Sequence, residues 1–355
     1  MTAAGGWKER PLTVASAGIG MVGVSFGMAR YGFGLLAPDI RAAFRLSSGS
    51  LGVLSAASYV AYIAASLIAA ALVGRLGARA AVVAGGVLAC VGMLIAAGAQ
   101  TAAVLFAGLL IAGASAGLAF PPFSDVAARL AASSRSRVLA AVSSGTGWGV
   151  ALAVPIALLA GQQWRVAWVG FAVLAALATV WAATVLPRRA GAAVTTHAGP
   201  AAERPHALLT ASLLFGLASS VYWTFAVDHV QSAGALTSTQ SRLFLAIVGV
   251  ASVAGTLSAQ LVDRLGARPL FLVATVAEAV ALLVVGLVPG RLAAVSASAV
   301  LFGAAYNTVA AVMAMWSVRV YAHQPSRGIA ALMAAQATGL LVGPPVLGAV
   351  ADRTG

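Results

Sequence analysis

Two ionisable side chains lie inside long apolar segments of this sequence, where charged residues are otherwise scarce. Arg30 lies about two-thirds of the way along a run near residues 12–38, and Glu278 lies near the centre of a run near 269–289. An arginine at the centre of a bilayer costs about 2.5–3.5 kcal/mol on insertion scales, so it needs a polar partner or a cavity. Arg30 is therefore a candidate anion-binding residue or a member of a proton-transfer network. The alternatives are a structural pair or a side chain that reaches the membrane surface.

Glu278 offers a second kind of chemistry, because no other acid lies so deep in an apolar run. A carboxyl group in apolar surroundings favours its neutral form and can bind a proton. Glu278 is thus a candidate proton site, or else a structural contact with a polar neighbour. Asp125, at the end of the run near 102–124, is the other candidate proton site. Its alternative is an ion pair with Arg129, one helical turn later.

Aromatic and amide side chains occur in several of these runs. Aromatic walls with a few polar groups are typical of a small-molecule pocket, and they are equally typical of helix packing and of membrane-surface belts. The candidates to line a pocket together with Arg30 are Tyr31, Phe120, Phe123, Tyr222, Trp223, Tyr306, Asn307 and Gln336.

The composition predicts the elements that must position these residues. Hydrophobic residues make up 61% of the 355 residues and charged residues only 8%, against about 25% in soluble proteins. The mean hydropathy is +0.99. Apolar runs of about 20 residues recur, and each can cross a ~30 Å hydrocarbon core as a helix. Eleven such helices are predicted, near residues 12–38, 50–73, 78–99, 102–124, 138–160, 164–187, 207–230, 240–262, 269–289, 291–317 and 328–350. The fold class is an all-α membrane protein.

The same composition argues against other classes. The net charge of +13 is scattered over single loops, so nucleic acid is not an expected partner. Cys90 is the single cysteine, and the four histidines form no cluster with it, so we expect no enzyme, no metal site and no cofactor.

Most of the 21 Lys and Arg residues lie in alternate loops, on the side of the N-terminus. Positive loops stay cytoplasmic, so we expect a plasma or inner membrane protein with a cytoplasmic N-terminus.

A basic loop is written twice, as VGRLGAR at residues 73–79 and as VDRLGAR at 262–268. Further pairs recur 190 residues apart, including Gly113 with Gly303 and Gly149 with Gly339. This spacing predicts two six-helix halves of parallel topology, at residues 1–186 and 207–355. A polar linker at 187–206 would join them in the cytoplasm. The equivalent of the sixth run would begin at residue 355, so the second half is expected to be truncated, with its last helix missing.

With these loops, the chain resembles a transporter of the major facilitator superfamily, in which the loop reads roughly G-x-x-x-D-R-x-G-x-R. The first copy carries Gly74, Arg75, Gly77 and Arg79, and the second carries Asp263, Arg264, Gly266 and Arg268. The acid is present only in the second copy. The segment FGMARYGFGLLAPDIRAAFRLS also resembles the first helix of bacterial exporters of the superfamily.

The resemblance implies a secondary transporter that works by rocker-switch alternating access. It implies a small organic substrate bound near the membrane midplane, ion-gradient-coupled efflux with H⁺ as a candidate coupling ion, and a monomer. The paired loops would form a cytoplasmic latch, in which Gly77 and Gly266 allow a left-handed turn at a helix end. Asp263 opposes the dipole of its helix, so it is expected to have another partner. The alternative function is a non-transporting sensor or scaffold with the same fold.

Overall fold

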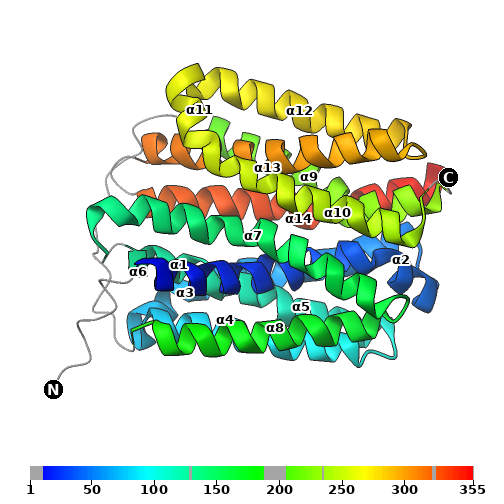
Figure 1. Ribbon diagram of the computed structural model, residues 1–355, viewed down its shortest axis with the longest axis horizontal. Coiled ribbons are helices and arrows are strands. Elements are labelled where there is room, and N and C mark those ends of the chain that lie inside the picture. Colours follow the sequence, from blue (N-terminus) through cyan, green and yellow to red (C-terminus); the bar gives the residue numbers. More distant parts are fainter. Residues whose placement is uncertain (1–10, 128–129, 188–204, 234–235, 322–324, 355) are drawn as a thin grey trace. The chain divides into compact units, whose positions relative to one another are not determined.

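The computed structural model describes residues 11–127, 130–187, 205–233, 236–321 and 325–354, and all regular elements in them are helical (Figure 1). In this part of the chain, 11 helical segments are long and apolar enough to cross a membrane. This number confirms the expectation from hydropathy. The predicted linker at 187–206 lies almost entirely outside the described residues, as does Arg129.

The chain divides into two compact units, residues 1–44 with 57–193 and residues 45–56 with 194–355. In chain order, the first unit holds α1 (Pro11–Val22), η1 (Gly23–Met28), α2 (Gly32–Phe44), most of α3 (Ser48–Leu76), α4 (Ala78–Ala97), α5 (Ala102–Ala119), α6 (Pro121–Ala127), α7 (Ala132–Ala160) and α8 (Trp164–Val185). The second holds the start of α3, then α9 (Pro205–Ser232), α10 (Ser238–Ser252), η2 (Val253–Leu257), α11 (Ser258–Leu265), α12 (Ala267–Leu287), α13 (Leu292–Val320) and α14 (Pro325–Thr354).

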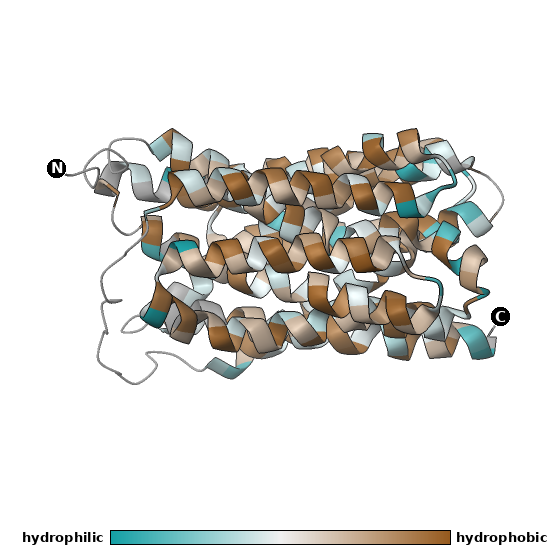
Figure 2. Ribbon diagram, turned by 90° about the horizontal axis from the view of Figure 1, so that it is seen from below, coloured by the Kyte–Doolittle hydropathy of each residue, from teal (hydrophilic) through white to brown (hydrophobic). Residues whose placement is uncertain are grey.

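The helices form where Ala-, Leu- and Val-rich runs allow them, and local polar residues fix several of their ends. Thr101 accepts a hydrogen bond from Val104 N at the start of α5. Thr237 and Gln240 form a reciprocal capping box at the start of α10. Such caps satisfy backbone N–H groups that have no partner within the helix. Figure 2 shows apolar residues along the helices and more polar ones toward their ends, as helices in lipid require.

The internal repeat extends to the contacts between helices. A Cβ atom on Gly113 of α5 would meet the backbone of Ser58 in α3, and one on Gly303 of α13 would meet the backbone of Val248 in α10. Both members of the second pair lie 190 residues after those of the first. Each unit therefore contains the same close helix crossing. Such crossings need small residues, because lipid supplies no hydrophobic force between helices.

A second crossing is repeated in the same way. A Cβ on Gly149 of α7 would meet the carbonyl of Gly23, and a Cβ on Gly339 of α14 would meet the carbonyl of Leu213 in α9. The 190-residue spacing holds again for both partners. Two helix crossings thus recur with one spacing, while the bounds of the two predicted halves stay a prediction.

Candidate functional site

Arg30 follows a local distortion of the first membrane span. The span begins as α1, continues as the π-helix η1, and resumes as α2 after a turn at residues 29–31. Two backbone bonds have π-helical spacing: Ala29 N to Val24 O at 2.8 Å and Tyr31 N to Phe26 O at 3.0 Å. A π-bulge inserts an extra residue into the helical register and is often found at functional sites. Here it immediately precedes the buried arginine.

The guanidinium of Arg30 lies among aromatic rings of the first unit. Its Cζ atom is 4.3 Å from the ring centroid of Tyr59 and 4.4 Å from that of Tyr62, both on α3. The rings of Phe26 and Tyr31 lie at 5.2 and 5.6 Å. Arg30 is only 6% exposed. Each ring within about 6 Å attracts the cation through its quadrupole, and the attraction is larger in a desolvated site. We call Arg30 with these four rings the arginine cage.

Two of the predicted pocket residues in the first unit have different surroundings. Phe120 packs edge-to-face on Phe26, with centroids 6.1 Å apart, and so extends the arginine cage. Phe123 lies in an apolar cluster that includes Met21, Val82 and Val142. Phe120 is therefore next to the cage, and Phe123 belongs to the core that supports it.

The aromatic candidates of the second unit form a separate cluster around Phe302 of α13. Tyr222 stacks on Phe302 with centroids 3.7 Å apart, and Trp223 meets its edge at 5.6 Å. Tyr306 stacks on Phe302 at 5.7 Å and on Phe215 at 5.1 Å. We call these five residues the second-unit aromatic cluster. It packs α9 against α13 and contains three of the predicted pocket residues.

Polar groups border the second-unit aromatic cluster. Gln336 Nε2 donates to Tyr306 Oη at 3.3 Å, and the Tyr222 and Ser298 hydroxyls are 2.9 Å apart. Asn307 instead donates to the carbonyl of Ser252 at 3.0 Å, which ties α13 to α10. Gln336 therefore lies with the cluster, whereas the amide of Asn307 serves a helix contact.

Glu278 is buried in α12 and contacts Ser219 of α9. Ser219 Oγ lies 2.6 Å from Glu278 Oε1 and also 2.6 Å from Phe215 O. A hydroxyl has one proton and can donate to only one of these oxygens at a time. A protonated Glu278 would donate to Ser219, leaving the serine proton for the Phe215 carbonyl. The geometry thus satisfies both short contacts when Glu278 carries a proton. Asp125, the other candidate, is half-buried on α6.

The paired loops have one backbone conformation. Gly77 has φ 87° and ψ 162°, and Gly266 has φ 85° and ψ 152°. The positive φ agrees with the expectation, but the ψ values differ from a left-handed helical turn and fall in an extended region that only glycine adopts readily. Each glycine ends one helix and begins the next, so an extended residue is needed to reverse the chain direction.

The charged residues of these loops lie at the surface. Arg75, Asp263, Arg264 and Arg268 are exposed, and Arg79 is half-buried. Asp263 has no ion pair or side-chain hydrogen bond among the described residues, so the partner expected for it is not found there. Gly74 has open space around it, since a Cβ atom added there would meet nothing within 4 Å.

Several residues of these sites were not predicted from the sequence. Tyr59 and Tyr62 complete the arginine cage, Phe302 centres the second-unit aromatic cluster, and Ser219 contacts Glu278. The sequence does indicate that Tyr59 and Tyr62 lie side by side, because residues three apart in a helix lie on one face. Nothing local in the sequence pairs Ser219 with Glu278, which is 59 residues away.

A family model described as "Uncharacterised MFS-type transporter YbfB" matches residues 22–355. The chain belongs to the major facilitator superfamily. Solved structures at low sequence identity share the fold. The nucleoside transporter NupG superposes with a TM-score of 0.76 at 15% identity, over 97% of this chain and 91% of that one. A bacterial homolog of the human lysosomal transporter Spinster, inward-facing and unoccupied, gives 0.75 at 13%, over 99% and 84%. At these identities the likeness concerns the fold.

Curated relatives match this chain over a shorter stretch. Monocarboxylate transporter 11 of Mus musculus is 37% identical over 146 residues, which are 41% of this chain and 31% of that protein. The Homo sapiens protein of the same name is 38% identical over 146 residues, 41% of this chain and 30% of that protein. The aligned part thus spans about a third of the length of these relatives.

Proposed function

We propose that this transporter moves a small organic anion across the membrane by alternating access, and that Arg30 binds the anionic group. The observation that carries the proposal is the arginine cage, a buried guanidinium held by four aromatic rings in the first span. A buried arginine is expensive in a membrane and is retained where it has a function.

The cage is compatible with an anion as a further ligand of Arg30. Aromatic rings attract a guanidinium through its face, whereas its N–H groups donate hydrogen bonds in its plane. The aromatic rings and a bound carboxylate would therefore approach the guanidinium from different directions. The rings meet its face, and the carboxylate would lie in its plane. The rings would fix the orientation of the guanidinium, and a planar carboxylate could then bind in a bidentate manner.

The substrate class we propose is a small monocarboxylate. The support is the charge of Arg30 together with the match to two proteins named monocarboxylate transporters. Aromatic walls also suit the apolar part of such a molecule. Within the second unit, the aromatic cluster with Tyr222, Trp223, Tyr306 and Gln336 offers a surface of the same aromatic and polar character.

We further propose that H⁺ is the coupling ion and that Glu278 binds it. The support is the pair of 2.6 Å contacts of Ser219, which are both satisfied when Glu278 is protonated. From the loop charges we propose a cytoplasmic N-terminus in the plasma or inner membrane, and from the exporter-like first span we propose export as the direction. Action as a monomer is proposed from the resemblance to the family.

The test is flux in proteoliposomes that contain the purified transporter, with radiolabelled lactate as the probe. We expect Arg30→Ala to lower lactate counterflow at least tenfold, and Arg30→Lys to retain part of it. Tyr59→Leu and Tyr62→Leu should raise the lactate concentration for half-maximal flux severalfold, because each cation–π contact contributes about 1–2 kcal/mol when desolvated.

The matched control is Arg165→Ala. Arg165 also lies over an aromatic ring, that of Trp164 at 4.2 Å, but at the start of α8. It should leave lactate flux unchanged. Equal losses in Arg30→Ala and Arg165→Ala would contradict a specific role for the cage. Lactate-induced thermal stabilisation with no flux in the unmodified protein would instead favour the sensor alternative.

A further inference from the structure

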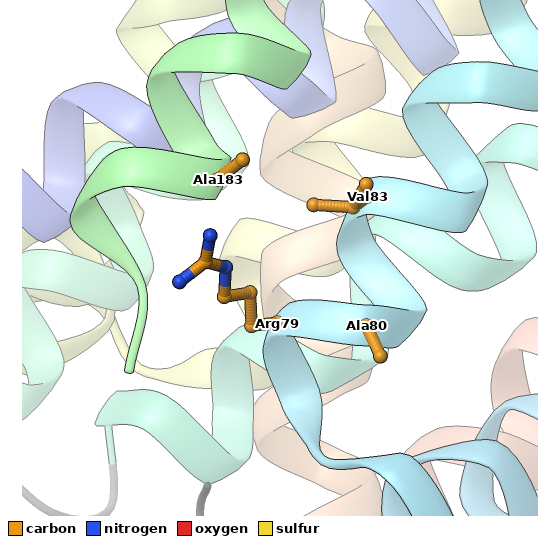
Figure 3. Close-up of a pocket in the computed structure, with 4 residues that line it drawn as sticks. All are labelled: Arg79, Ala80, Val83 and Ala183. Atoms are coloured by element: carbon orange, nitrogen blue, oxygen red, sulfur yellow. The ribbon is translucent and has the colours of Figure 1, made fainter. Parts of the chain in front are cut away.

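An open cavity of about 330 Å³ lies between α4 and α8 of the first unit. Its lining consists of Arg79, Ala80 and Val83 from α4 and Ala183 from α8. Figure 3 shows the guanidinium of Arg79 reaching into the space between the two helices, toward Ala183 of α8. The cavity thus joins one cation to small apolar walls. Neither the arginine cage nor the second-unit aromatic cluster contributes to it.

The apolar wall continues along α4 away from Arg79. Val83, Val87, Val91 and Leu94 follow at spacings of three or four residues, which places them on one helix face. The last three are exposed. From Val83 to Leu94 the helix rises about 16 Å at 1.5 Å per residue. This is close to the thickness of one leaflet of a ~30 Å hydrocarbon core.

A matching wall lies on α8, which packs beside α4 (Figure 1). Val180, Leu177 and Val173 follow Ala183 toward the start of the helix at spacings of three or four residues, and all three are exposed. Beyond the cavity, both helices therefore present exposed apolar residues over similar lengths. Such a surface is suited to bind a hydrocarbon chain.

The polar end of the groove is electropositive. Arg79 lies in the first turn of α4, which contains no acidic residue, and Gly77 at the N-cap supplies no capping side chain. The positive end of the helix dipole thus adds to the charge of Arg79. Arg79 also lies at the end of the membrane span Ala78–Ala97, where lipid headgroups begin. A phosphate is the anionic group expected at this depth.

We propose that the groove between α4 and α8 binds an anionic glycerophospholipid, with its phosphate on Arg79 and an acyl chain along the two apolar walls. The guanidinium matches phosphate in a bidentate manner. With the cytoplasmic N-terminus proposed above, this end of α4 would face the leaflet that carries the anionic lipids attracted by basic residues. The lipid site does not depend on the transport substrate proposed above.

The repeat supplies a matched control in Arg268. This residue has the same place in the second copy of the loop and is exposed. Among the described residues, α12 packs on α9, α11 and α13, whereas α4 packs on α8 as well as on α5 and α6. Both copies of the loop therefore carry an arginine at this position. The neighbouring α8 wall, which completes the groove, is part of the first unit.

The experiment is native mass spectrometry of the full chain in detergent, titrated with phosphatidylglycerol or phosphatidylcholine. We expect phosphatidylglycerol to bind more tightly. Arg79→Ala should weaken it about fivefold, because one basic residue near an anionic surface contributes about 1 kcal/mol. Arg268→Ala should have little effect. Ala183→Leu, which narrows the groove without changing charge, should weaken both lipids and leave helicity unchanged.

Three results would overturn the proposal. Equal losses in Arg79→Ala and Arg268→Ala would mean that diffuse charge attracts the lipid. Equal affinity for the two lipids would remove the role of the phosphate charge. Glycerol 3-phosphate competing as effectively as phosphatidylglycerol would identify a site for free organic phosphate, with no contribution from the acyl chain. Ala183→Leu decides the role of the groove even if Arg79→Ala fails to fold.

Discussion

The carboxylate of Asp352, in the last turn of α14, accepts a hydrogen bond from the backbone N–H of Gly49 in the first turn of α3, at 2.8 Å. Its other oxygen accepts from Ser48 N at 2.9 Å. Ser47 Oγ accepts from Ser50 N at 3.2 Å, so the first three N–H groups of α3 all have partners. The two Asp352 contacts join residues 304 and 303 positions apart, and both partners belong to the second unit.

The Asp352 contact should protect the start of α3 from local opening. We expect Asp352→Ala to accelerate amide hydrogen exchange in a peptide covering residues 45–56, because two N–H groups lose a charge-assisted acceptor. Asp352→Asn, which keeps one acceptor oxygen, should give an intermediate rate. Hydrogen exchange read by mass spectrometry measures this. Arg353→Ala is the control on the next residue, and identical exchange in all variants would show that the cap contributes nothing.

The repeated helix crossings should tolerate no added methyl group. Gly113→Ala places a Cβ against the backbone of Ser58, so we expect destabilisation of about 1–3 kcal/mol, the usual cost of overpacking. Gly303→Ala should cost a similar amount at the equivalent crossing. Thermal unfolding in detergent measures both. Gly286→Ala, where a Cβ meets open space, is the control and should not lower the transition temperature.

Gly77 and Gly266 should be required at their positions, because each adopts a positive φ. Alanine at Gly77 or Gly266 must adopt the φ of 87° or 85° found there, which costs about 1–3 kcal/mol per residue. We expect each substitution to lower the unfolding temperature by a similar amount. Gly74→Ala lies three residues away in a regular helix and should be neutral or slightly stabilising, since alanine favours helix. A tolerated Gly77→Ala would mean that the loop can be rebuilt without positive φ.

The contacts of Glu278 predict that one substitution can abolish coupling to the pH gradient while lactate exchange persists. Glu278→Gln presents an amide N–H to Ser219, as a protonated carboxyl does, so the packing of α9 on α12 should persist. We expect lactate exchange at equal pH to survive, while uptake driven by a pH gradient is lost. Proteoliposome assays with and without the gradient distinguish the two. Gradient-driven accumulation by Glu278→Gln would remove Glu278 from the coupling mechanism.

Much of the fold follows from the sequence, because its determinants are local. The 11 spans are set by apolar runs, and the recurrence of VGRLGAR as VDRLGAR predicts two halves. Positive φ at Gly77 and Gly266 follows from the position of a glycine between two helices. Burial of Arg30 follows from its place in an apolar run. Each of these depends on neighbours in the chain.

Tertiary structure alone determined the partners of these residues. The guanidinium of Arg30, which follows a π-helix, lies beside Tyr59 and Tyr62, and no local pattern in the sequence encodes these partners. Ser219 meets Glu278, and Asp352 meets the start of α3, through the packing of distant helices. In a membrane, apolar patterning identifies a span but not which of its faces meets another helix, because lipid and helix interior are equally apolar. The sequence therefore determined where polar residues enter the membrane, and packing determined what each of them contacts.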